Sequence, residues 1–380
     1  MPSNPPKIIA ELFGLADIQI NGDRPHDIRV HDPRVFDAIL SRWSLGLGES
    51  YMDGWWDCQR LDEMVARLLA ADLNNQVTGL ARLRTVSEVL RAKLLNLQSQ
   101  SRAFQVGEEH YDLGNDLFER MLDPRMIYSC AYWEHAMNLT QAQEHKLDMI
   151  CRKLNLQPGE RLLDIGCGWG GLAEFAARHY GVSVLGVTIS KEQQAFAQRR
   201  CHGLPVEISL SDYRDLNQSF DKIVSVGMFE HVGEKNYSVY FDTAKRLLAD
   251  EGLFLLHTIG SDVTTQATDP WINKYIFPNG KIPSAKELAA TLEGRFLIED
   301  WHNFGRDYDR TLMAWHANFV RAWPELATRY GQRFYRMWEF YLLACAGYFR
   351  SRQGQLWQLV LSKRHRRQMY RSIRLGISNS

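Results

Sequence analysis

The sequence of 380 residues has no apolar run near the roughly 18 residues that a membrane-spanning helix needs. Its first residues also lack the apolar core of a secretory signal peptide. Its 45 basic and 45 acidic side chains balance, so the overall charge does not favour nucleic acid as a partner. We therefore expect a cytoplasmic protein that binds no nucleic acid and contacts membranes only peripherally.

Cysteine is scarce and carries no motif. The six cysteines form no CxxC pair and match no zinc-ligand spacing. They are Cys58, Cys130, Cys151, Cys167, Cys201 and Cys345. This pattern predicts no metal site and fits a reducing compartment.

The length of the chain favours two domains. A polar stretch, Gln98–Ser101, indicates a boundary between them. We expect a smaller N-terminal α+β and helical domain over residues 1–97, a linker over 98–109, and a larger domain over 110–380.

Leucines at helical spacing predict a helix near the end of the first domain, over residues 80–97. Several basic side chains, from Arg82 to Lys93, lie on the rest of that helix. They fit a surface that binds anionic lipid headgroups, which would make this domain the lipid-interacting one. The alternative is the solvated basic face of a helix whose leucines point into the core, and the periodicity alone favours this alternative.

Helical and strand patterns alternate through the middle of the chain. The expected strands are 161–165, 182–187, 220–226 and 253–258, and the expected helices are 139–154, 172–179, 191–201 and 237–248. Further helical patterns follow at 312–319 and 334–349. Alternation at this spacing predicts a doubly wound α/β sheet from about residue 105 onward.

A glycine-rich turn follows the first of these strands and opens a helix. Gly166, Gly168 and Gly171 match the dinucleotide-binding pattern GxGxxG. Gly166, Gly168 and Gly170 match the GxGxG turn of class I methyltransferases. Because glycine has no Cβ, the backbone can approach a ligand closely at such a turn. The glycines alone do not decide between the two.

The neighbouring acidic residues separate the two possibilities. A dinucleotide site has an acid about 20 residues after the turn, at the end of the second strand, and residues 186–190 contain none. Asp164 lies just before the first glycine, and Asp212 with Tyr213 lies where a methyltransferase places an acid and an aromatic ring against adenine. The comparison favours a Rossmann-like class I methyltransferase fold and leaves a nicotinamide oxidoreductase as a remote alternative.

Several segments resemble the cyclopropane fatty acid synthases and occur in that family's order. They are His110–Asn115, Tyr128–Trp133, Leu163–Gly171, Gly186–Ser190, Gly227–His231, Leu256–Ile259 and Asp307–Asp309. The front segment Ser44–Trp56 resembles the family as well, whereas the related mycolic acid cyclopropane synthases largely lack this domain. The resemblance covers nearly the whole chain and points to the branch that acts on phospholipids.

The resemblance implies transfer of a methylene group from S-adenosylmethionine to the cis double bond of an unsaturated phospholipid acyl chain, which closes a cyclopropane ring. The residues it places around S-adenosylmethionine are Tyr128, Ser129, Asp164, Gly166, Cys167, Gly168, Gly170, Thr188, Gln193, Asp212 and Tyr213, with His110 and Tyr111 closing over it. It also implies a homodimer that associates peripherally with the inner membrane.

Such a reaction has two physical demands. Attack of the alkene on the sulfonium methyl leaves a carbocation, so water must be excluded. A base must then remove a proton from the transferred methyl group. In the family this base is a bound bicarbonate ion, and the resemblance assigns its site to Cys130, Glu230, His257 and Tyr308, with the backbone of Ile259.

Cys345 lies at a position to which the family is sometimes assigned a catalytic cysteine. Sulfonium chemistry needs no thiol nucleophile, so packing among small helical residues is the alternative role for this side chain. The basic run Lys363–Arg367, with Arg371 and Arg374, fits either a site for anionic headgroups or a solvated chain end.

Two further functions stay open. A related methyltransferase could leave the cation to be reduced or trapped, giving a methyl-branched or hydroxylated chain, although an intact set of base residues favours ring closure. A lipid carrier could bind acyl chains without chemistry, although a carrier has no use for Asp164, Gly166 and Asp212 together.

Overall fold

The computed structural model describes residues 5–71, 114–265 and 267–374. The described residues form two compact units. One contains 5–71, 267–278 and Tyr308–Gly354, and the other contains 114–265, Asn279–Asp307 and 355–374. The helix expected over 80–97, the linker, and His110 with Tyr111 lie outside the described residues. Neither unit is continuous in sequence, and the expected domains 1–97 and 110–380 stay a prediction.

The second unit is built on a seven-stranded sheet with the order β5-β4-β3-β6-β7-β9-β8. Its strands are β3 (Arg161–Ile165), β4 (Ser183–Thr188), β5 (Val206–Leu210), β6 (Phe220–Val226), β7 (Leu248–Ser261), β8 (Leu297–Asn303) and β9 (Gly354–Ser362). The pairs β3–β4, β4–β5, β3–β6 and β6–β7 are parallel, and β8–β9 is antiparallel. Strand order therefore reverses on either side of β3, as in a doubly wound fold.

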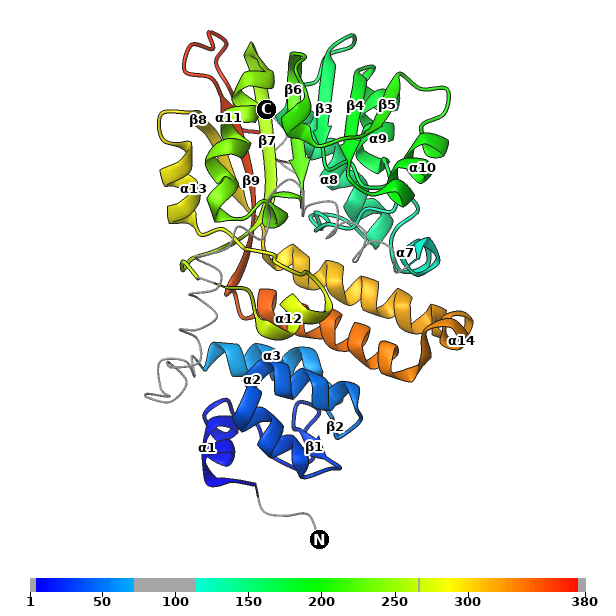
Figure 1. Cartoon of the computed structure of the whole chain (residues 1–380), viewed down its shortest axis with the longest axis vertical. Helices are drawn as coiled ribbons and strands as arrows, with labels where there is room; N and C mark the ends of the chain where they lie inside the picture. Colours follow the sequence, from blue (N-terminus) through cyan, green and yellow to red (C-terminus); the bar gives the residue numbers. More distant parts are fainter. Residues whose placement is uncertain (1–4, 72–113, 266, 375–380) are drawn as a thin grey trace. The chain divides into compact units, whose positions relative to one another are not determined.

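Helices cover both faces of this sheet (Figure 1). Side chains of α8 (Leu139–Lys153) and α9 (Gly171–Tyr180) share one apolar cluster with one face of the parallel strands. Side chains of α11 (Tyr237–Leu247) and α13 (Ala285–Leu292) share another cluster with the opposite face. Alternate residues of a strand point to opposite faces, so adjacent apolar residues of one strand, such as Leu162 and Leu163 of β3, belong to opposite clusters.

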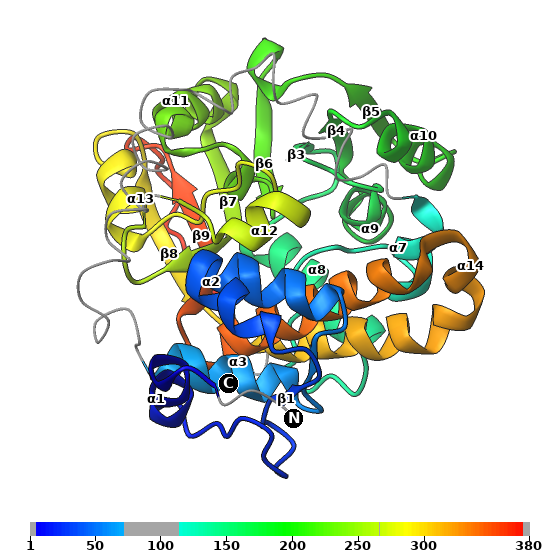
Figure 2. The same cartoon turned by 60° about the horizontal axis from the view of Figure 1, so that its bottom comes forward.

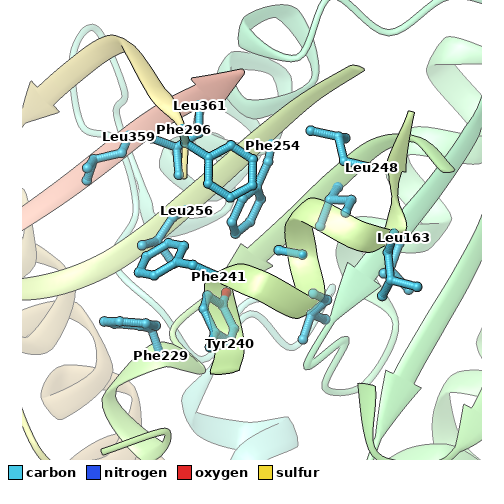
Figure 3. Close-up of a cluster of buried hydrophobic side chains, with 14 of the residues drawn as sticks. Leu163, Phe229, Tyr240, Phe241, Leu248, Phe254, Leu256, Phe296, Leu359 and Leu361 are labelled. Atoms are coloured by element: carbon cyan, nitrogen blue, oxygen red, sulfur yellow. The ribbon is translucent and has the colours of Figure 1, made fainter. Parts of the chain in front are cut away.

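The cluster under α11 is rich in aromatic rings (Figure 3). Phe241 packs against Phe254 of β7 and against Phe296, with ring centroids 6.4 and 6.3 Å apart. Phe229, which follows β6, stacks on Tyr237 at 4.4 Å. The chain after β6 is thereby fixed against α11, which matters because the neighbouring residue is Glu230.

The remaining elements of this unit are short. They are α7 (Asn115–Met121), α10 (Lys191–Arg200) and the 3-10 turns η1 (Tyr213–Asp215), η2 (Phe229–His231) and η3 (Glu234–Asn236).

The first unit is mainly helical. Its elements are α1 (Lys7–Leu15), β1 (Arg29–Val30), α2 (Arg34–Met52), β2 (Trp56–Asp57), α3 (Leu61–Ala70), α12 (Pro270–Tyr275) and α14 (Arg306–Arg350), of which the last begins in the other unit and breaks at Gly331. Although distant in sequence, α12 lies beside α2 (Figure 2). A Cβ at Gly48 would come within 2.4 Å of the Trp271 ring, so glycine is required for this close approach.

The structure confirms the predicted α/β alternation. Strands β3 and β6 have the predicted bounds. The helices α8 to α11 begin and end within one residue of their own predicted bounds. Strands β8 and β9 were not predicted. Within the part of the chain that the structure describes, no helix is both long and apolar enough to span a bilayer.

Candidate active site

Several of the predicted site residues lie where the parallel strands of the second unit end. The glycine turn follows β3, Thr188 ends β4, Asp212 follows β5, and Glu230 follows β6. Parallel strands present their carboxyl ends along one edge, and ligands of doubly wound sheets bind there, at the point where strand order reverses. That point is β3 and its neighbour β6, so the turn and Glu230 belong to adjacent strands.

The glycine turn uses backbone conformations that other residues rarely adopt. Gly166, Gly168 and Gly170 have φ of +84°, +52° and +80°. A Cβ at Gly166 would lie 2.8 Å from the Met228 side chain, so this glycine is needed for packing. A Cβ at Gly168 would meet no atom within 4 Å. Gly168 therefore presents bare backbone toward open space, as a close-binding ligand requires.

The end of β4 is held by a small hydrogen-bond network. The Thr188 hydroxyl donates to Gln193 Oε1 at 2.9 Å, and Ser190 Oγ caps α10 by accepting from the Gln193 N–H. Thr188 and Gln193 are both buried. The network fixes the turn after β4 beside the glycine turn, where Val187 O accepts the N–H groups of Gly166 and Cys167 at 3.0 Å.

Asp212 and Tyr213 follow β5 as predicted, but the Asp212 carboxylate already has a partner. Arg214 donates to it from Nε at 2.8 Å and from Nη2 at 2.5 Å. Tyr213 packs edge-on against Tyr240 at 5.5 Å, and burial raises the pKa of its hydroxyl. Arg214 holds the Asp212 carboxylate in one orientation, which suits a group that accepts from ligand hydroxyls.

A buried lysine, Lys146 of α8, contacts a predicted site residue and was not itself predicted. Its Nζ donates to Ser129 Oγ at 2.8 Å. Its charge also acts on Cys130, Asp164 and His257. Burial lowers the pKa of Lys146 to about 8 and raises that of Asp164 to about 7, although Lys146 opposes the second shift. One hydrogen bond and three charge interactions thus link a single ammonium group to four predicted residues from three separate segments.

Cys130 is fully buried, and its Sγ lies 3.2 Å from Ala131 O. The neighbouring Tyr128 ring packs edge-on against Phe118 at 5.2 Å, and Phe118 packs in turn against Trp169 of the glycine turn at 4.9 Å. The segment that carries Tyr128, Ser129 and Cys130 is therefore linked to the turn through aromatic contacts.

Glu230 lies in η2 and binds the end of β7 rather than capping a helix. Its Oε1 accepts the Ile259 N–H at 2.7 Å. Its Oε2 is buried and has no hydrogen-bond partner within the described residues. Burial raises the pKa of this carboxyl to about 7. A buried acceptor without a partner is costly unless a ligand supplies a donor.

His257 lies two residues before Ile259 on β7 and is also buried. Its Nδ1 lies 3.2 Å from Gln358 Nε2 of β9, and its Nε2 has no hydrogen-bond partner among the residues described. Burial, together with the charges of Lys146 and Lys153, lowers the pKa of His257 well below its ordinary value. The ring is therefore neutral at physiological pH.

Tyr308 and Cys345 belong to the first unit. The Tyr308 ring stacks on Phe349 at 4.5 Å. Burial raises the pKa of the Cys345 thiol to about 12, which keeps it protonated near neutral pH. The roles assigned to both residues from the family resemblance stay predictions.

The polar residues that the sequence analysis missed share one helical face. Gln143, Lys146 and Lys153 of α8 are all buried, at spacings of three and seven residues among apolar neighbours. Polar residues repeated at core positions of a helix are a signal that this face contacts something polar.

Comparison with known proteins identifies the family. The family model described as mycolic acid cyclopropane synthetase matches residues 98–359. The chain belongs to this family. It is 60% identical to the cyclopropane-fatty-acyl-phospholipid synthase of Escherichia coli (strain K12), over 94% of this chain and 93% of that one. It is 33% identical to the tuberculostearic acid methyltransferase UfaA1 of Mycobacterium tuberculosis, over 89% and 83%.

Solved structures agree with this membership. The cyclopropane synthase MmaA2 from Mycobacterium tuberculosis is 32% identical and superposes with a TM-score of 0.65, over 68% of this chain and 98% of that one. The mycolic acid cyclopropane synthase CmaA1, solved with SAH and CTAB, is 33% identical with a TM-score of 0.64, over the same shares. The protein is thus an enzyme of the cyclopropane synthetase family with the class I methyltransferase fold.

Proposed function

We propose that this enzyme transfers a methylene group from S-adenosylmethionine to the cis double bond of an unsaturated phospholipid acyl chain, forming a cyclopropane ring. The observation that carries the proposal is the 60% identity, over nearly the full length of both chains, with a protein named for this activity. The match includes residues before 98, which the family model does not cover.

S-adenosylmethionine supplies an electrophilic methyl group when it is bound. The residues present fit such a ligand, because the bare backbone at Gly168 follows β3 and the oriented carboxylate of Asp212 follows β5, and only β4 lies between these two parallel strands. The chain's own task is then to hold the donor, exclude water from the cation and place a base near the new methyl group.

Bicarbonate supplies that base in the proposal. The residues fit it as well, since Glu230 Oε2 is a buried acceptor and His257 Nε2 a buried nitrogen, neither with a hydrogen-bond partner in the described parts of the chain. Glu230 would accept a hydrogen bond from the bicarbonate hydroxyl and thereby orient it. Two anions in contact must share a proton, and the pKa of about 7 for Glu230 suits that exchange near neutral pH.

The family assignment also gives Cys130, Tyr308 and the backbone of Ile259 to this ion. In the structure the Ile259 N–H donates to Glu230 Oε1. The backbone at Ile259 therefore acts here by holding Glu230 in place. The charge of Lys146 interacts with both Cys130 and His257, which supports a role for Cys130 near the ion.

The proposal is tested by incubating the protein with liposomes of unsaturated phospholipid and labelled S-adenosylmethionine, followed by mass analysis of the acyl chains. The expected product gains one CH2 and no longer contains an alkene. A saturated methyl-branched product would indicate the related methyltransferase activity instead, and unchanged acyl chains would indicate a lipid carrier.

Peripheral membrane association would bring the enzyme to this substrate. The C-terminal run supports it in part, because Arg364, Arg367 and Arg371 are exposed, with Met369 beside them 86% exposed. Two other basic side chains of this run form ion pairs within the second unit, Lys363 with Asp250 at 3.1 Å and Arg374 with Asp300 at 2.6 Å. A homodimer remains part of the proposal on family grounds.

Replacing the three exposed arginines Arg364, Arg367 and Arg371 with glutamine is expected to weaken binding to anionic liposomes by about 100-fold, at roughly 1 kcal/mol for each basic residue near the surface. Added salt should weaken wild-type binding in the same way, because exposed charges are screened. Sedimentation with liposomes measures both effects. If neither added salt nor the triple substitution weakens liposome binding, this run does not contact the headgroups.

A further inference from the structure

Beyond the residues assigned to the ion, we propose that Lys153 and Gln358 are positioning residues that fix the tautomer of His257, so that its Nε2 carries the proton and donates to the bound oxyanion. This inference rests on the proposed function for the identity of that anion. The contacts that carry it all lie within the second unit.

The three side chains form a chain of hydrogen bonds. Lys153 Nζ donates to Gln358 Oε1 at 2.9 Å, and Gln358 Nε2 lies 3.2 Å from His257 Nδ1. A lysine ammonium has donors only, so the amide oxygen of Gln358 must face it. The amide nitrogen then faces His257 and donates to Nδ1. Because Nδ1 accepts, the single proton of the neutral ring resides on Nε2.

Lys153 is itself held as a donor. Its side chain is fully buried, and three acceptors surround Nζ: Gln358 Oε1 at 2.9 Å, His302 Nδ1 at 3.1 Å and Asp300 Oδ2 at 3.5 Å. Three acceptors match the three N–H bonds of an ammonium group. Burial lowers the pKa of Lys153 to about 7 even with the opposing effect of the Asp300 carboxylate, so the ammonium form predominates below about pH 7.

Asp300 is fixed from its other side. Arg374 donates to both of its oxygens, at 2.6 and 2.7 Å, and Ser372 donates to Oδ1 at 3.1 Å. The chain of hydrogen bonds therefore begins at the ion pair of Arg374 with Asp300 and ends at the ring of His257. Each group in it has one permitted direction of donation, which is what fixes a tautomer.

The consequence concerns the free end of His257. Its buried Nε2 has no other hydrogen-bond partner within the described residues, so the proton there is available to an anion. The opposite tautomer would turn a lone pair toward the anion and repel it. Neither Lys153 nor Gln358 need touch the anion for this effect, since both act through the ring.

The first test is the tautomer itself. Nitrogen NMR of the full-length protein labelled with ¹⁵N-histidine, with the His257 signals assigned by their loss in His257→Gln, is expected to show a protonated Nε2 and an unprotonated Nδ1. A protonated Nδ1 in the wild type would overturn the inference. This readout does not depend on activity, so it stands even if the proposed reaction is wrong.

The second test measures dependence on added bicarbonate. Gln358→Met keeps the side-chain length but removes the donor, and it is expected to raise the bicarbonate concentration for half-maximal activity about 10-fold, the size of one lost hydrogen bond. KM for S-adenosylmethionine should not change. Lys153→Met, which frees the amide to rotate, should act in the same direction and serves if the first variant does not fold.

Gln355→Met is the matched control. It makes the same substitution three residues earlier on β9 and removes the contacts of that amide with Asn303 and Trp357, but it leaves the contacts from Lys153 to His257 intact. It should lower thermal stability without changing the bicarbonate dependence. If the control and Gln358→Met shift that dependence equally, or neither shifts it, the positioning role is refuted. A wild-type enzyme indifferent to bicarbonate would instead refute the assigned ion, and the tautomer would still be read by NMR.

Discussion

Glu230→Gln is expected to lower kcat by about 10²- to 10⁴-fold, the range typical of losing acid–base assistance, while the affinity for S-adenosylmethionine stays nearly unchanged. Glutamine has almost the same shape, and its Oε1 can still accept the Ile259 N–H. Its amide NH2 would replace Oε2, however, and a donor there cannot accept the bicarbonate hydroxyl. Turnover measured on liposomes and calorimetric titration of S-adenosylmethionine together give the two quantities.

The same carboxylate predicts how kcat depends on pH. Burial raises the pKa of Glu230 to about 7, so the carboxylate that must accept is lost as pH falls through that value. Wild-type kcat should therefore rise with pH through about 7 and then level off, and Glu230→Gln should lack this rise. Glu234→Gln, an exposed carboxylate four residues later, is the control and should match the wild type. A variant at Glu230 with normal kcat would show that the carboxylate does not assist.

The central sheet could be predicted from sequence because its strands are buried on both faces. Strands β3 and β6 each contain a short apolar segment between turn signals, Leu162–Leu163 in β3 and Ile223–Val224 in β6, and both strands were predicted with correct bounds. Strands β8 and β9 were missed for a different reason. They pair antiparallel with each other at one end of the sheet. Strand β9 directly follows a long helix, and its sequence has no periodicity that distinguishes a strand from a continuation of that helix.

The residues assigned to the site from family motifs could be named, but their surroundings could not. The positions of Lys146 and Lys153 among the apolar residues of α8 are only a weak local signal of burial, since charged residues on a helix are usually solvated. His257 and Gln358 lie 101 residues apart in sequence, and only the pairing of strands brings them into contact. Tertiary contacts of this kind decide which atoms are left for a ligand, such as Glu230 Oε2.

Gly168→Ala is expected to weaken binding of S-adenosylmethionine at least ~10-fold beyond any loss of stability, which corresponds to ~1.4 kcal/mol. The substitution adds only a Cβ, which would meet no protein atom within 4 Å. With φ at +52° it costs about 1–2 kcal/mol of folding free energy. What the Cβ does block is close approach of a ligand to the backbone of the turn.

Gly159→Ala separates these two effects. Gly159 has φ of +85° and likewise has open space where a Cβ would lie, but it lies in the turn before β3, at the opposite end of the strand from Gly168. Both variants should lose similar thermal stability, and only Gly168→Ala should lose affinity in calorimetric titration. Equal affinities in the two variants would mean that the turn does not hold the donor. The proposed methylene transfer would then lose the structural basis for its donor site, because S-adenosylmethionine is placed at the end of β3 on the ground that it can approach the backbone of Gly168 closely.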